Sequence, residues 1–179
     1  MLVEHKKLRS CHTSKIYQAL LTAISDKTKA LEIRCRALEA AAPLSLPQVK
    51  KAITEAYQGN NSKLKISAIY AMGKNCDHCW LPTLLKELAS PDTEIRYEAA
   101  EACAELGAEE AIPSLKELIA DPDIDVQFAA IQALGKIGGN EAKECLEQCL
   151  DGPSEAIYQA AEQALRELET WEDPFAFKA

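Results

Sequence analysis

The chain has 179 residues, of which 47% are apolar and 6% aromatic, and its formal net charge is −8. A domain of this length can bury a sizeable core, and a composition rich in Ala and Leu favours helices over strands. No apolar run is long enough to span a bilayer, and seven scattered cysteines lack the dense spacing of a disulfide scaffold, so we expect a cytoplasmic protein with reduced thiols and no membrane partner.

Charge is divided unevenly along the sequence. Residues 1–75 contain 13 Lys or Arg and 5 Asp or Glu, a net charge of +8, whereas residues 76–179 contain 7 and 23, a net charge of −16. A solvated surface accounts for this pattern, and a molecule with one basic and one acidic end is the alternative, which would bias how partners approach. The acidic charge of residues 76–179 argues against a general nucleic-acid-binding protein, and we expect no nucleic-acid partner.

The sequence repeats itself at an interval of 31 residues. IPSLKELIADPD at residues 112–123 aligns with LPTLLKELASPD at residues 81–92, and two positions hold alanine in all five copies. One position contains Ala37, Ala68, Ala99, Ala130 and Ala161, and the other contains Ala40, Ala71, Ala102, Ala133 and Ala164. A period of this length predicts a stacked array of helical pairs.

In chain order, the register predicts a single domain with two distinct ends. The N-terminal segment MLVEHKKLRSCHTS lacks the apolar core of a secretory signal, and a capping helix is expected over residues 12–25. Four helical pairs follow, at about residues 28–60, 61–91, 92–122 and 123–153. The last copy, within residues 154–179, keeps only its first helix, where Glu162 occupies an otherwise uncharged slot, as in a cap that meets water. The tail is expected to fold back over this helix, with partner binding as the alternative, through the aromatic residues Trp171, Phe175 and Phe177.

The third repeat shows how each copy specifies two helices. Asp92 is a good N-cap, and the equivalent positions hold the capping types Asn61, Asp123 and Ser154. Gly107 is placed to end the first helix in the left-handed conformation, and Pro113 suits the first turn of the second. Because the two alanine positions lie three residues apart on the first helix, both meet a neighbouring helix, and leucine at Ala99 or Ala102 should overpack the core.

The pattern D-x-x-[IV]-R-x-x-A-A in a 31-residue helical pair resembles the HEAT-like repeats of bilin-lyase-type proteins. The stretches that carry the resemblance are DTEIRYEAAEACAELG and DIDVQFAAIQALGKIGG, and it covers about residues 28–170. It implies an all-α fold, a right-handed α-α superhelix of the HEAT-like or armadillo-type solenoid class with about five repeats. In that family an Arg of the first helix commonly pairs with a loop Asp. Here Arg34, Lys65 and Arg96 keep a basic residue, whereas Gln127 and Tyr158 depart from it.

Two cysteines and a histidine lie close together in the loop of the second repeat. Cys76, His78 and Cys79 are ligand types that suit zinc, but a structural zinc site needs four ligands. The sister loops GAEE and GGNE connect similar helices without a thiol. We therefore expect ordinary loop residues and no cofactor, with metal or iron–sulfur handling and thiol chemistry as alternatives. Of the other cysteines, Cys103 and Cys149 align with core positions, while the position of Cys145 is compatible with exposure.

The sequence contains no recognisable catalytic set. None of the histidines His5, His12 and His78 precedes a Glu, so the paired His-Glu ligands of the di-iron branch of the resembled family are missing. No Gly-rich phosphate loop or nucleophile elbow occurs. The second helices carry several carboxylates, Glu87 among them, that suit a solvated surface better than a nucleic-acid groove. We therefore expect a protein that is not an enzyme.

In a HEAT-like array the second helices usually line the concave face, so we expect a partner protein to bind there. Trp80 and Leu85 are apolar where sister repeats place small or polar residues, and an exposed Trp80 would be a typical interface residue. The alternative is that Trp80 packs over the next repeat. The other candidate contacts are Lys86, Lys116, Glu117 and Glu147. The prediction is a protein-interaction scaffold, and the resemblance implies an alternative role as an accessory of bilin or tetrapyrrole attachment.

Overall fold

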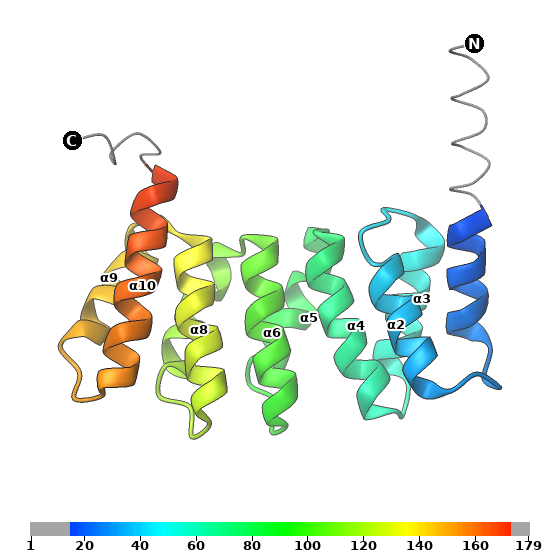
Figure 1. The fold of residues 1–179 in the computed structure, drawn as a ribbon, viewed down its shortest axis with the longest axis horizontal. Coiled ribbons are helices and arrows are strands. Elements are labelled where there is room, and N and C mark those ends of the chain that lie inside the picture. Colours follow the sequence, from blue (N-terminus) through cyan, green and yellow to red (C-terminus); the bar gives the residue numbers. More distant parts are fainter. Residues whose placement is uncertain (1–14, 173–179) are drawn as a thin grey trace, which may run out of the picture. The chain divides into compact units, whose positions relative to one another are not determined.

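The computed structural model describes residues 15–172, with side chains as far as Thr170, and this part of the chain is all-α (Figure 1). The described residues form two compact units, one ending at Asn75 and the other beginning at Cys76. The boundary is also the point at which the net charge of the sequence changes from positive to negative. Within residues 15–172, no helix has the length and apolar character needed to cross a membrane.

The first unit contains a helix over residues 15–25, followed by α2 (Leu31–Ala41), α3 (Pro47–Gln58) and α4 (Ser62–Asn75). α4 packs against both α2 and α3. The Asn75 side-chain amide donates a hydrogen bond to the carbonyl oxygen of Ala42 at 2.8 Å, which joins the ends of α4 and α2. The core consists of fully buried side chains, the largest of which are Leu38, Val49, Ile53, Ile69 and Met72.

The second unit alternates first and second helices of the repeat. Its first helices, α6 (Thr93–Leu106), α8 (Ile124–Ile137) and α10 (Glu155–Glu172), lie side by side in one layer (Figure 1). Each second helix packs against the first helix that follows it, so that α5 contacts α6, α7 contacts α8 and α9 contacts α10. The second helices and their leading 3-10 turns are η1 (His78–Trp80) with α5 (Leu81–Glu87), η2 (Glu109–Ala111) with α7 (Ile112–Leu118), and α9 (Gly139–Leu150).

The predicted helix starts and stops are confirmed. The Asp92 carboxylate accepts the backbone N–H groups of Glu94 and Ile95, which satisfies two donors at the start of α6. Gly107 ends that helix at φ 62°, in the left-handed region. Equivalent side-chain caps are made by Asn61, Asp123 and Ser154.

The two alanine positions are buried with one exception. All five alanines of the first position are buried, and so are Ala71, Ala102, Ala133 and Ala164 of the second. Ala40 is exposed, and so is Ile33, although Ile95 at the equivalent place in α6 is buried. Both residues are exposed because the described residues contain no first helix of an earlier repeat that could pack against that side of α2.

The last helix, α10, has 18 residues, whereas the equivalent helices α6 and α8 have 14 each. The expected first helix of the final copy is present as α10, and Glu162 is partly exposed on it, as a capping position should be. The expected folding back of the tail concerns Phe175, Phe177 and the side chain of Trp171, which lie outside the described residues. That the whole array acts as one domain stays a prediction.

Candidate functional site

The loop before α5 holds Cys76, His78 and Cys79, the residues for which the sequence left metal binding as an alternative. Cys76 adopts a positive φ of 51°, as Gly107 (62°) and Gly138 (71°) do at the same position of the sister repeats. Its thiol lies 3.8 Å from the carbonyl oxygen of Glu105, and the Asp77 carboxylate accepts the N–H of Cys79 at 2.9 Å, which caps η1. Nowhere in residues 15–172 are three His, Cys, Asp or Glu side chains placed to hold a metal ion. The geometry thus gives Cys76 and Asp77 roles in shaping the turn.

Trp80 is buried, at 7% exposure, and therefore does not form the exposed interface residue that the sequence suggested. Ala111 and Ala142 occupy the same slot in the next two repeats and are fully buried, so the slot belongs to the core in every copy. Glu87 is also buried, at 4% exposure, rather than part of a solvated carboxylate face. Its register partners, Leu118 and Cys149, show that this too is a core slot.

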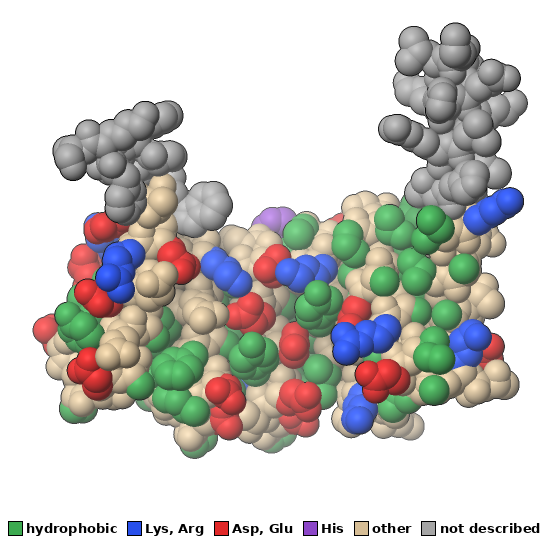
Figure 2. All heavy atoms as spheres, in the orientation of Figure 1, with side chains coloured by type: hydrophobic (Ala, Val, Ile, Leu, Met, Phe, Trp, Pro, Cys, Tyr) green, Lys and Arg blue, Asp and Glu red, His purple; other side chains and the backbone are tan. Residues whose placement is uncertain are grey.

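The remaining predicted contacts lie on the surface of the second helices. Lys86, Lys116, Glu117 and Glu147 are exposed, and Leu85 is half-buried. α7 contacts α9, so Lys116 and Glu147, which share one register position, lie on adjacent helices. We call the four exposed residues the charged row. On the opposite layer, acidic side chains spread over α6, α8 and α10 (Figure 2).

A buried ion pair joins the first helix of the third repeat to the loop that ends it. The Arg96 guanidinium donates from Nε to Asp121 Oδ2 at 2.7 Å and from Nη2 to Oδ1 at 2.9 Å. It also donates to the carbonyl oxygen of Ser90 at 2.9 Å, and Asp121 Oδ1 accepts the N–H of Asp123 at 2.9 Å. The hydrogen bonds from Arg96 hold the pKa of Asp121 below its usual range, and the same contact raises the pKa of Arg96.

The buried thiols of the second unit are poor nucleophiles. Burial raises the pKa of Cys103 to about 12, and it also raises the pKa values of Cys145 and Cys149. The core positions of Cys103 and Cys149 are confirmed. Cys145, for which the sequence was compatible with exposure, is buried because α9 packs against both α8 and α10.

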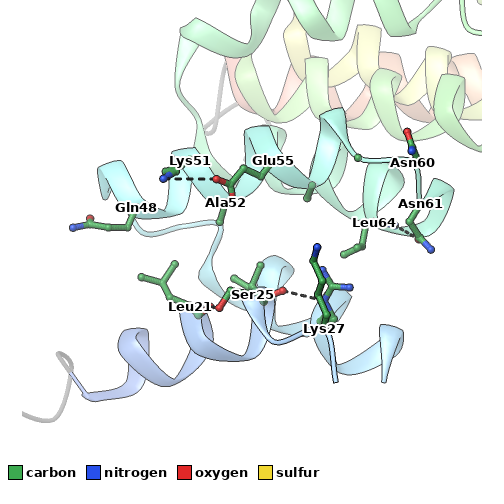
Figure 3. A pocket seen from close by; sticks show the side chains of 14 residues that line it. Leu21, Ser25, Lys27, Gln48, Lys51, Ala52, Glu55, Asn60, Asn61 and Leu64 are labelled. Carbon is green, nitrogen blue, oxygen red and sulfur yellow. Dashed lines mark hydrogen bonds and ion pairs between the residues drawn. The ribbon is translucent and has the colours of Figure 1, made fainter. Parts of the chain in front are cut away.

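The first unit contains a groove of about 880 Å³ that sequence reasoning missed. Figure 3 shows Leu21 and Ser25 on its lower wall, from the helix of residues 15–25, and Ala52 facing them from α3. The groove has apolar walls and a basic rim, on which Lys51 lies 3.7 Å from Glu55. The other cations that line it are Lys27 and Arg34. A smaller groove of about 500 Å³ lies between α8 and α10 in the second unit.

Residues 81–166 match the family model of HEAT repeats. These residues carry HEAT repeats. No curated protein matches the chain. Among solved structures, it is similar to a chain in the complex of CpcE and CpcF of phycocyanin lyase from Nostoc sp. PCC7120, with a TM-score of 0.68 and 21% identity. That match covers 88% of this chain and 66% of the other, so this chain spans slightly less than two thirds of the length of that one.

Two further structures share the fold. Human deoxyhypusine hydroxylase in complex with glycerol gives a TM-score of 0.51 at 22% identity, over 91% of this chain and 77% of that one. A designed armadillo repeat protein in complex with the peptide (KR)4 gives a TM-score of 0.63 at 18% identity, over 91% and 86%. At these identities the likeness shows the fold, a helical solenoid of the HEAT and armadillo type.

The Arg–Asp pairing that the resemblance implied occurs at one repeat. Arg96 and Asp121 form it, and Gln127 of the next HEAT-like repeat instead donates to the Asp121 carbonyl oxygen at 2.5 Å. Arg34 of the first repeat donates from Nε to the carbonyl oxygen of Ile24 at 3.0 Å. The Nζ atom of Lys65 in the second repeat lies 5.2 Å from the centroid of the Tyr57 ring, so this position makes a different contact in each of these four repeats.

Proposed function

We propose that this HEAT-like protein is a non-enzymatic scaffold that binds another protein through the face formed by its second helices. The observation that carries the proposal is the charged row of Lys86, Lys116, Glu117 and Glu147, which is exposed on helices that are anchored to the core by buried residues such as Leu84, Leu115 and Leu146. Side chains of both signs on adjacent helices suit a partner of complementary pattern, since charge complementarity sets specificity and association rate.

The similar structures support a protein or peptide as the partner. One is a complex of two proteins, and another is an armadillo repeat protein in complex with a peptide. Stacked repeats present an extended surface of regularly spaced side chains, which suits a chain better than a compact small molecule.

The proposal is tested by capture from the native cell with matched variants. The tagged protein should retain a partner protein in near-stoichiometric amount, and the charge-swapped variant Lys116→Glu with Glu147→Lys should lose most of it. Arg166→Glu, an exposed reversal on α10, is the control and should retain the partner. No stoichiometric protein on the wild type would refute the scaffold. Equal capture by all three would refute the second-helix face.

A second candidate function is an accessory role in bilin or tetrapyrrole attachment. The observation that favours it is the shared fold with the chain from the phycocyanin lyase complex. It predicts visible absorbance on the protein after incubation with a bilin, whereas the scaffold alone predicts none. The third alternative, metal handling by Cys76, His78 and Cys79, predicts near-stoichiometric metal in the purified protein by elemental analysis.

A further inference from the structure

The 31-residue register pairs each basic position of a first helix with a loop position 25 residues later. For Arg96 that position is Asp121, whose carboxylate binds the guanidinium through two hydrogen bonds. For Arg34 it is Gly59, which has no side chain. The first repeat therefore keeps the cation of this pair and lacks its carboxylate.

Arg34 has no carboxylate within ion-pair distance among the described residues. Its Nε donates to the carbonyl oxygen of Ile24, and the guanidinium lines the groove of the first unit. Asp26 lies near enough for Arg34 to contribute a minor lowering of its pKa, but the Asp26 carboxylate is held by the backbone and hydroxyl of Thr28, at 3.0 and 2.6 Å. Arg34 thus differs from Arg96, whose Nη atoms donate hydrogen bonds to the Asp121 carboxylate and the carbonyl oxygen of Ser90.

Gly59 is not required by the backbone. It adopts φ −71° and ψ 165°, an extended conformation open to any residue. A Cβ there would lie 3.3 Å from the carbonyl oxygen of Glu55 and 3.4 Å from that of Ala56, which is tight but not a clash. Gly59 and Arg34 line the same groove, so the missing side chain at Gly59 leaves open space in it.

The neighbouring loop residue completes the comparison. In the third repeat the N–H of Asp123 donates to the Asp121 carboxylate at 2.9 Å. The counterpart of Asp123 in the first repeat is Asn61, which also lines the groove. The groove is thus lined by the first-repeat counterparts of Arg96, Asp121 and Asp123, of which the middle one carries no carboxylate.

We infer that this groove binds an acidic segment of a partner protein, with one Asp or Glu carboxylate at the place that Asp121 fills in the third repeat. Aliphatic neighbours of that residue lie along Leu21 and Leu64, and Lys27 and Lys51 meet further acidic residues at the rim. Charge complementarity supports an acidic occupant, because residues 15–75 hold ten Lys or Arg against four Asp or Glu. The apolar walls favour a peptide over a free anion, and a guanidinium can bind a carboxylate in two-point fashion.

This inference rests on the proposed function, because it names a chemical class of partner for the scaffold. It concerns a surface separate from the charged row, so the two can be tested independently.

The test uses the full chain and a dye-labelled probe peptide, (Glu-Leu)4, with acetylated and amidated ends, followed by fluorescence anisotropy. The matched probe is (Gln-Leu)4. Wild type should bind the glutamate peptide at least about tenfold more tightly than the glutamine peptide, because charge-assisted hydrogen bonds discriminate between them. Gly59→Asp restores the internal carboxylate and should weaken glutamate-peptide binding by at least about tenfold, whereas Gly59→Asn, of equal size and no charge, should stay within about threefold of wild type.

Several results would overturn the inference. These are equal affinity for both peptides, unchanged binding by Gly59→Asp, or the same loss in Gly59→Asn as in Gly59→Asp. Thermal melting by circular dichroism checks the fold. If Gly59→Asp does not fold, Arg34→Gln replaces it and must show the same selective loss. Self-association of wild type that Gly59→Asp abolishes would make a second copy the occupant and would also refute the proposal. Partner capture that depends on Lys116 but is unaffected by Gly59→Asp would leave the scaffold standing and this groove without its role.

Discussion

Replacing Asp121 by alanine should destabilise the second unit by about 3–5 kcal/mol, the usual cost of leaving one member of a buried ion pair without its partner. The Arg96 and Asp121 side chains are only 12% and 4% exposed, so water cannot compensate the guanidinium effectively. The substitution also removes the acceptor of the Asp123 N–H at the start of α8. The effect should therefore lie in the upper rather than the lower part of the range for single substitutions.

Urea unfolding followed by helicity measures this difference. Asp125→Ala is the control, since Asp125 is an exposed acidic residue in the first turn of α8. Its replacement should lower the free energy of unfolding by less than about 1 kcal/mol. The double variant Arg96→Met with Asp121→Leu should be more stable than Asp121→Ala, because it removes both charges together. A cost below about 1 kcal/mol for Asp121→Ala would refute the pair as a stabilising contact.

The same pair predicts a direction of pH dependence. The folded-state pKa of Asp121 is lowered by Arg96, so its contribution is fully present above the unfolded pKa of about 3.9 and is lost as pH falls through the lower folded value. The stability difference between wild type and Asp121→Ala should be constant from pH 8 to about pH 5 and should shrink below about pH 4. A difference that stays constant down to pH 2 would contradict the assignment.

Three further predictions concern packing and the cysteine loop. Gly135→Ala should lower the melting temperature, because the added Cβ would lie 2.9 Å from the Cβ of Ala164. The cost of overpacking, about 1–3 kcal/mol, exceeds the gain of about 1 kcal/mol in helix propensity. A raised melting temperature would argue against this close approach of α8 and α10. Ala99→Leu should destabilise by about 1–3 kcal/mol in urea unfolding, and an unchanged midpoint would show that the helix faces are wrongly assigned. The double variant Cys76→Ser with Cys79→Ser should melt as wild type does, with or without chelator. A sharp loss of stability on adding chelator to wild type would instead reveal a metal that takes part in folding.

Much of the fold could be predicted because the repeat aligns residues whose local chemistry is decisive. Capping by Asp92 and the left-handed stop at Gly107 depend on one or two neighbouring backbone groups, so residue type is sufficient to predict them. The core slots of Cys103 and Cys149 followed from their apolar counterparts in other copies.

The two corrections concern slots in which one repeat carries an unusual residue. Glu87 is buried, so its assignment to a solvated face was wrong, and of the two alternatives left open for Trp80 its burial excludes the exposed one. In both cases the register contained the correct signal, because small or apolar residues stand at the same place in the next two repeats. The position of a residue within the repeat therefore predicts its burial better than its residue type does, since each copy packs against its neighbour through the same positions.

Ends and grooves could not be predicted from the register alone. Ala40 is exposed because the repeat before it is missing from the described array, a fact about neighbours that no single copy encodes. The groove beside Arg34 depends on the separation and orientation of the helix of residues 15–25 and α3, which the periodicity of the sequence does not determine. The sequence shows that Gly59 stands in the first repeat where Asp121 stands in the third. That this difference removes the partner of an arginine could be inferred only from the observed ion pair of Arg96 with Asp121.

Native mass spectrometry of the protein purified from its own cell tests most directly the central claim, that these HEAT-like repeats bind another protein. The account predicts a complex whose mass exceeds that of the chain by the mass of a partner protein, and which on dissociation releases the chain without a chromophore or metal adduct. A chain that carries a chromophore or metal adduct and no partner protein would contradict it.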